Sequence, residues 1–240
     1  ADTVTTIYVT SNKSIYGEID QQVTTGNLSG TVSDGEREIS LTQAEGGLEF
    51  RNEDLPVVEG KTYKITVNSD KGFSAEASCT VPVKRNLNIE ADTTMITEDN
   101  PGYGKNYYVS SKIYLTDPPG EDNFYRFICK ELIYDIGYYY YPEKLRLIGP
   151  EEELFSDEGR KGEKILVNTI IASDSPKSDS TFLVFYILHT DKPYYLFHRS
   201  LENYSGGDNP FSEISPVYSN VTGGLGIVAA FTVDSLVLRL

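Results

Sequence analysis

The alternation of apolar and polar residues along the chain predicts short β-strands in both halves. The clearest example is GKTYKITVNSDKGFSAEASCTVP (residues 60–82), where apolar and polar residues alternate over residues 63–67. SDKG supplies a turn, and Pro82 cannot donate to a β-ladder, so this stretch predicts a hairpin. Shorter strand-like runs precede it: TIYVT, NLSGTVS, REISLT and GLEFR. Strands at this spacing predict an immunoglobulin-like β-sandwich over residues 1–84.

The rest of the chain, residues 85–240, is predicted to form a larger β-sandwich or barrel-like domain. Residues 83–103 are polar and irregular, which indicates a connector and places the boundary near residue 84. NYYVSSKIYLTD alternates regularly, and NFYRFICKELIYDIGYYYY is long for one strand, so we expect a bend or a bulge at Gly137. TFLVFYILHT is apolar on both faces, so we expect it in the centre of a sheet.

One helix is predicted, near residues 192–205. In DKPYYLFHRSLENYSGG, Asp191 stands at the N-cap position and Pro193 in the first turn. Apolar residues then recur at helical spacing over residues 194–204, and a pair of glycines follows. The predicted fold class is therefore all-β with one short helix.

Composition narrows the classes of partner. The 240 residues carry a net charge of −15, which repels nucleic-acid backbones and anionic lipid surfaces. The longest apolar run, FLVFYIL, has the length of a strand and not of a membrane-spanning helix. The N-terminal ADTVTTIYV has no features of a signal peptide, so we expect either a cytosolic protein or one whose leader has been removed.

A glycine-rich stretch near the C-terminus, SNVTGGLGIVAAF (residues 219–231), contains the order G-x-G-x-x-A of dinucleotide-binding loops. That motif requires a following helix and an acidic residue about 20 positions later. Only eleven residues follow Ala229, and they have the pattern of a strand. We therefore predict no cofactor here and expect the glycines to turn the chain into a terminal strand.

The other reactive residue types predict no catalytic or metal site. Cys79 and Cys129 lack the spacing of metal ligands, and we expect two buried thiols that are not bonded to each other. His189 and His198 lie outside any H-E-x-x-H arrangement and are expected to be structural or surface residues. The acidic run PEEELFSDEG (residues 150–159) is expected to be a solvated loop, with a Ca²⁺ site as the alternative.

The most unusual feature is a run of tyrosines in YDIGYYYYPEKLR. Consecutive residues of a strand point to opposite faces, so these rings cannot all enter one core. Tyrosine is favoured at binding surfaces because it combines a large ring with a polar tip. We predict that the run forms a ligand or partner surface, with a sandwich rim as the alternative. The residues are Tyr138, Tyr139, Tyr140 and Tyr141.

Several motifs occur in a fixed order in the second half and identify a family. They are DPPGEDNFYRF (117–127), SDEGRKGEK (156–164), HRSLENY in the predicted helix, and NPFSEISPVYSNVTGGLGIVAAF (209–231). Together with the hairpin at 60–82 they resemble the Bacteroidetes outer-membrane lipoprotein family known as domain of unknown function 4249, over nearly the whole chain. One departure is Val228-Ala229-Ala230, where the family often has an aromatic residue.

The resemblance implies an exported protein, anchored in the outer membrane through a lipidated cysteine upstream of Ala1, beside a TonB-dependent transporter. It implies neither an enzyme nor a known ligand. We therefore predict a non-enzymatic binding or accessory component of an import system, whose ligand is a small molecule, peptide or glycan. The alternative is a structural or adhesive surface module that binds proteins or glycans. A hydrolase that uses the abundant acidic residues is the third interpretation.

Overall fold

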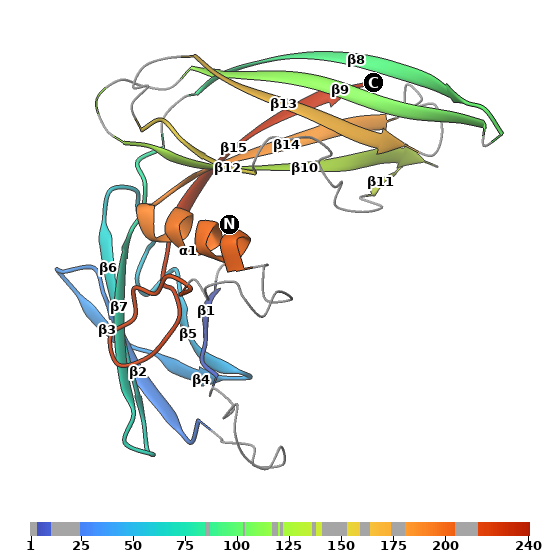
Figure 1. Cartoon of the computed structure of the whole chain (residues 1–240). Coiled ribbons are helices and arrows are strands. Elements are labelled where there is room, and N and C mark those ends of the chain that lie inside the picture. Colours follow the sequence, from blue (N-terminus) through green and yellow to red (C-terminus); the bar gives the residue numbers. More distant parts are fainter. Residues whose placement is uncertain are drawn as a thin grey trace. The chain divides into compact units, whose positions relative to one another are not determined.

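The computed structural model describes residues 4–10, 25–84, 87–102, 104–116, 120, 122–135, 138–140, 153–158, 164–173, 181–204 and 216–240. The chain forms two compact units (Figure 1). The first contains Ala1–Val83 and Leu196–Ala230, and the second contains Lys84–Tyr195 and Phe231–Leu240. The C-terminal part of the sequence is thus divided between the units.

Two antiparallel sheets form the first unit. One has the strand order β1-β5-β4 and the other the order β3-β2-β6-β7. The strands are β1 (Val4–Tyr8), β2 (Leu28–Ser33), β3 (Glu38–Ser40), β4 (Thr42–Ala44), β5 (Gly47–Arg51), β6 (Thr62–Ser69) and β7 (Ser74–Thr80). The chain passes from one sheet to the other at the buried Leu41, whose amide donates to the Gly30 carbonyl at 2.8 Å.

Apolar side chains from both sheets of the first unit pack into one core. Val32 from β2, Leu48 from β5 and Leu55 are completely buried in it. The hairpin predicted at residues 60–82 is present as β6 and β7, with Tyr63 opposite Cys79. Burial of the apolar positions on both sheets explains why this half forms a sandwich.

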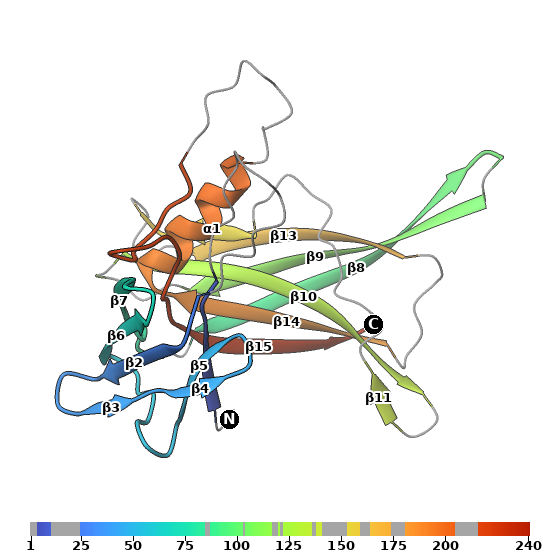
Figure 2. The same ribbon diagram turned by 90° about the horizontal axis from the view of Figure 1, so that it is seen from below.

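The second unit is also built from two antiparallel sheets, which Figure 1 shows as two layers and Figure 2 shows overlapping face to face. Their strand orders are β13-β9-β8 and β11-β10-β14-β15, and β12 pairs with β10. The strands are β8 (Asn88–Asn100), β9 (Gly104–Thr116), β10 (Phe124–Asp135), β11 (Tyr138–Tyr140), β12 (Leu154–Ser156), β13 (Lys164–Ser173), β14 (Thr181–Thr190) and β15 (Phe231–Arg239). The core between the sheets includes Val109, Ile113, Leu115, Phe127, Leu183, Phe185 and Ile187. The predicted all-β, sandwich-like fold is confirmed.

The expected connector at residues 83–103 is wrong, because most of it is strand β8. This strand pairs with β9 from Asn88–Thr116 to Asn100–Gly104. Only Ile89 and Ala91 contribute apolar side chains to the core, and the remaining positions are largely polar and exposed. An exposed edge strand needs few apolar residues, so its sequence lacks the usual alternation.

The run expected to bend or bulge at Gly137 forms two separate strands. β10 ends at Asp135, and β11 returns antiparallel to it, with Asp135 opposite Tyr138. Gly137 lies outside the described residues. In contrast, β14 lies between β10 and β15, which confirms the central strand expected from its apolar faces.

The predicted helix is present as α1 (Lys192–Tyr204). Asp191 caps it, because its carboxylate accepts a hydrogen bond from the Tyr194 amide at 3.0 Å. Within the part of the chain that the structure describes, no helix has the length and apolar character needed to cross a membrane.

Candidate functional site

The glycine-rich segment lies along the free edge of β7 in the first unit. The Glu76 amide donates to the Thr222 carbonyl at 2.9 Å, and the Thr222 amide donates to the Glu76 carbonyl at 2.8 Å. The Asn220 side-chain amide adds a bond to the Ser78 carbonyl at 3.0 Å. Residues 219–228, which we call the glycine loop, are thereby fixed to β7.

Side chains at the base of the glycine loop hold its shape. The Asn220 side chain donates to the Val228 carbonyl at 2.7 Å and accepts from the Val228 amide at 3.0 Å. The Ser219 hydroxyl accepts from the amides of Val221 and Gly226, both at 3.2 Å. These bonds link the two ends of the glycine loop and tie Ser219 to Gly226 within it.

Gly223 is required by two features of the loop. Its φ of 81° lies in the left-handed region, and a Cβ at this position would lie 2.1 Å from the Ser74 carbonyl oxygen. The loop then leads into strand β15, which pairs with β14, and not into a helix. The predicted turn of the glycines into a strand is therefore confirmed.

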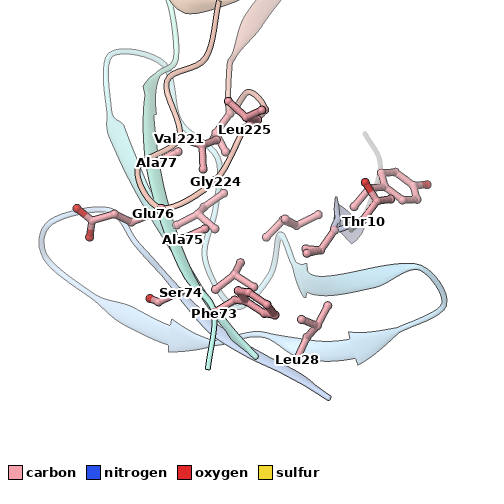
Figure 3. Close-up of a pocket in the computed structure, with 18 of the residues that line it drawn as sticks. Thr10, Leu28, Phe73, Ser74, Ala75, Glu76, Ala77, Val221, Gly224 and Leu225 are labelled. Atoms are coloured by element: carbon pink, nitrogen blue, oxygen red, sulfur yellow. The ribbon is translucent and has the colours of Figure 1, made fainter. Parts of the chain in front are cut away.

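A cleft of about 550 Å³ opens between the glycine loop, the β6–β7 hairpin and the end of β1 (Figure 3). Residues 7–10 line it on the side of β1, and residues 73–77 line it on the side of the hairpin. The glycine loop contributes Val221 and residues 223–228. Leu28 and Val67 lie among the apolar residues of its wall.

The lining of the cleft is mostly apolar and almost free of charge, with Thr10, Thr25, Ser69 and Ser74 as its uncharged polar residues. Glu76 is the single charged residue among the described residues that line it. Its carboxylate pairs with the Lys64 ammonium at 2.7 Å and points away from the cleft in Figure 3. A ligand in the cleft would therefore meet mainly apolar side chains, together with uncharged polar side chains and backbone groups.

Three large apolar side chains at the cleft are strongly exposed. Tyr8 on β1 is 78% exposed, Phe73 after the hairpin turn is 63% exposed, and Leu225 in the glycine loop is 79% exposed. Exposed apolar side chains gathered around one hollow are typical of binding surfaces. We call these three residues the rim.

The tyrosine run predicted as a binding surface lies in the second unit. Tyr138, Tyr139 and Tyr140 form β11, and Tyr139 is opposite Tyr134 of β10. Tyr141 lies outside the described residues. The role of this run as a ligand or partner surface stays a prediction.

Cys79 and Cys129 lie in different units and are not joined by a disulfide, as expected. Cys129 is buried as expected, whereas Cys79 is only partly buried. The ring of His189 stacks on Tyr125 with centroids 5.3 Å apart. His198 meets Phe197 edge to face at 5.4 Å. Among the residues that the structure describes, no three His, Cys, Asp or Glu side chains are grouped to hold a metal ion.

The described part of the acidic run is not a solvated loop, which corrects that expectation. Asp157 is fully buried and accepts hydrogen bonds from the Asn123 amide at 2.6 Å and its side chain at 3.1 Å. Glu153 pairs with Arg126 at 3.2 Å. These carboxylates hold the segment against β10, so their role is structural.

The cleft was missed in the sequence because its walls come from three distant segments. One signal was available, since Phe73 and Leu225 are large apolar residues beside turns rich in glycine. Such positions are normally polar and solvated. A large apolar residue beside such a turn therefore indicates that its side chain contacts another segment or a ligand, although the sequence alone does not show which.

Comparison with known families matches residues 1–236 to the family described as Domain of unknown function (DUF4249). Among curated proteins and solved structures, none matches the chain.

Proposed function

The chain belongs to the DUF4249 family, and from this membership and the cleft we propose that it is a non-enzymatic binding protein. It accepts an uncharged, apolar ligand in the cleft of the first unit. In the cell it is an exported lipoprotein that serves a TonB-dependent outer-membrane import system as an accessory component.

The observation that supports binding is the apolar cleft with its exposed rim. A volume of about 550 Å³ lies within the range of roughly 300–1,000 Å³ that is common for ligand sites. Tyr8, Phe73 and Leu225 surround it, and exposed apolar area of this kind favours association. The bonded glycine loop keeps one wall in place, which limits the entropy lost on binding.

The binding function is tested with the uncharged dye Nile red and the full chain. We expect saturable fluorescence enhancement that Leu225→Ala and Phe73→Ser each weaken roughly tenfold, as loss of an apolar anchor costs about 1–2 kcal/mol. Val58→Ala is the matched control, because Val58 is an exposed apolar residue of the same unit outside the cleft. Equal binding by all four proteins would contradict the proposal.

The cellular setting is tested separately with the complete precursor expressed in its native host. We expect incorporation of labelled palmitate, recovery in the outer-membrane fraction, and co-purification with a transporter after mild crosslinking. A protein that carries no lipid and fractionates away from the membrane would contradict this part of the proposal. It would not affect the proposal that the cleft binds a ligand.

A further inference from the structure

The two sides of the first sandwich differ in how they are closed. On one side the chain runs directly from β3 to β4 through the buried Leu41, so the two sheets are joined there. On the other side, β1 is the edge strand of one sheet and β7 is the edge strand of the other. The glycine loop covers the edge of β7 through Thr222 and Asn220. The cleft opens beside β1.

The outer edge of β1 presents backbone groups for hydrogen bonding. Among the described residues, β1 pairs with β5 alone. The Val9 amide donates to the Gly46 carbonyl at 3.2 Å, in register with the pairing of Ile7 and Leu48. Since bonding alternates along an antiparallel strand, the amides of Thr6 and Tyr8 point away from β5.

Within its own described residues, β1 has none of the sequence features that normally protect an edge strand. Its sequence, VTTIY, contains no charge and no proline, and its pairing with β5 is continuous, without a bulge. Proteins usually block free edges with such features, because an open edge is a template for another strand. The edge strand β8 shows the contrast, since Glu90, Asp92 and Glu98 lie along it.

We propose that the cleft binds an extended peptide segment of a partner protein, which adds a strand to the outer edge of β1. The inference rests on the proposed function, because it takes the cleft as the binding site. A strand beside β1 directs every second side chain toward the cleft. The uncharged lining requires those side chains to be apolar, since a charge buried there would lose its hydration without a partner. Tyr8, Phe73 and Leu225 then close over the added strand.

The first test uses the full chain and the probe peptide acetyl-Lys-Thr-Val-Thr-Val-Thr-Val-Lys-amide. Its twin is N-methylated at alternate residues, which removes the hydrogen bonds of one strand edge and leaves the side chains unchanged. We expect the probe to slow exchange of the Thr6 and Tyr8 amides at least tenfold, and the twin to bind at least tenfold more weakly.

The second test removes the outward amide of β1. Thr6→Pro deletes an N–H that points away from β5, a position where an edge strand tolerates proline. Thr6→Val is the matched control, because it keeps the amide. We expect Thr6→Pro to lose at least tenfold in peptide binding and to retain Nile red binding, while Thr6→Val keeps both. If circular dichroism shows that Thr6→Pro does not fold, the comparison of the probe with its N-methylated twin tests the proposal by itself.

Three outcomes would overturn the added strand. The probe and its twin could bind equally, the Thr6 and Tyr8 amides could already be protected without peptide by the chain itself, or the probe could fail to bind. Nile red distinguishes the two proposals. If the dye binds and the peptide does not, the cleft is a small-molecule site and only the strand is wrong, whereas failure of both removes the proposed function as well.

Discussion

The side-chain amide of Asn220 donates a hydrogen bond to the backbone carbonyl of Ser78 at 3.0 Å, across 142 positions of the sequence. The same amide donates to the Val228 carbonyl at 2.7 Å, and its oxygen accepts from the Val228 amide. One side chain therefore closes the glycine loop and attaches it to β7. Asn220 therefore helps to hold one wall of the cleft in place.

Asn220→Ala is expected to release the glycine loop from β7. Three hydrogen bonds are lost at partly exposed positions, which should lower the free energy of unfolding by about 1–3 kcal/mol. Exchange of the Glu76 amide, which is bonded to Thr222, should accelerate. Urea denaturation and amide exchange measure both effects.

Asn68→Ala, at an exposed position of β6, is the control and should change stability by less than about 0.5 kcal/mol. Equal effects of the two variants would contradict the role of Asn220.

Gly223→Ala should be far more damaging than Gly72→Ala. Both glycines have φ in the left-handed region, 81° and 84°, so an alanine costs roughly 1–2 kcal/mol at either position. A Cβ at Gly72 meets nothing within 4 Å, whereas at Gly223 it lies 2.1 Å from the Ser74 carbonyl. We expect an additional loss of about 1–3 kcal/mol in urea denaturation and weaker Nile red binding for Gly223→Ala alone. A similar loss for both variants would show that the loop does not press against β7.

The stability contribution of Asp34 should depend on pH. The hydrogen bond from the Lys61 ammonium, at 2.9 Å, and the bond from the Arg37 amide lower the pKa of the Asp34 carboxyl from 3.8 to about 2. Because the folded pKa is lowered, the contribution is complete above pH 3.8 and disappears as the pH falls through 2. The melting temperature of Asp34→Asn should therefore lie below that of the wild type at pH 7 and approach it near pH 2.

Glu53→Gln provides the control for this pH series. Its carboxylate pairs with Arg51 at 3.2 Å, but both side chains are exposed, so its removal should change the melting temperature little at pH 7. A constant difference between wild type and Asp34→Asn from pH 7 to pH 1.5 would contradict the ion pair with Lys61.

Local sequence patterns predicted those strands and helices whose own residues show the alternation, turn or cap that is typical of the element. The hairpin of β6 and β7 follows from strict alternation and a turn, and α1 follows from Asp191 at its N-cap with an apolar stripe. β14 follows from apolar residues on both faces. In each case the side chains that form the element also bury it, so a short window of sequence contains the physical cause.

The elements that the sequence did not predict depend on partners outside their own residues. β8 is a strand because it pairs with β9 along its whole length, although most of its own residues are polar. The glycine loop is placed by Asn220 and Thr222 against β7, more than 140 positions earlier. In neither case do the element's own residues indicate the partner that holds it in place. The cleft was missed for the same reason, since no single segment contains more than one of its walls.

The tyrosine run gives a prediction that competes directly with the cleft. If the rings of Tyr139 and Tyr140 are binding anchors, Tyr139→Ala and Tyr140→Ala should each weaken ligand binding by roughly 1–3 kcal/mol and leave the melting temperature nearly unchanged. The same titrations with Leu225→Ala decide which surface binds a given ligand. A large fall in melting temperature with intact binding would show that these tyrosines belong to the core.

Residues 1–84 are expected to fold alone, because both sheets of the first unit and most of its core lie within them. This fragment lacks the glycine loop, which bonds to the edge of β7, and Ala230, which packs against the core. We therefore expect a dispersed amide spectrum for residues 1–84, with fast exchange at Glu76.

Fusion of residues 216–230 to this fragment through a flexible linker should slow the exchange of the Glu76 amide and raise the melting temperature. The fused Asn220→Ala variant is the control and should recover only part of the gain. An undispersed spectrum for residues 1–84 that the fusion restores would show that the glycine loop is required for folding and does not merely stabilise a unit already formed.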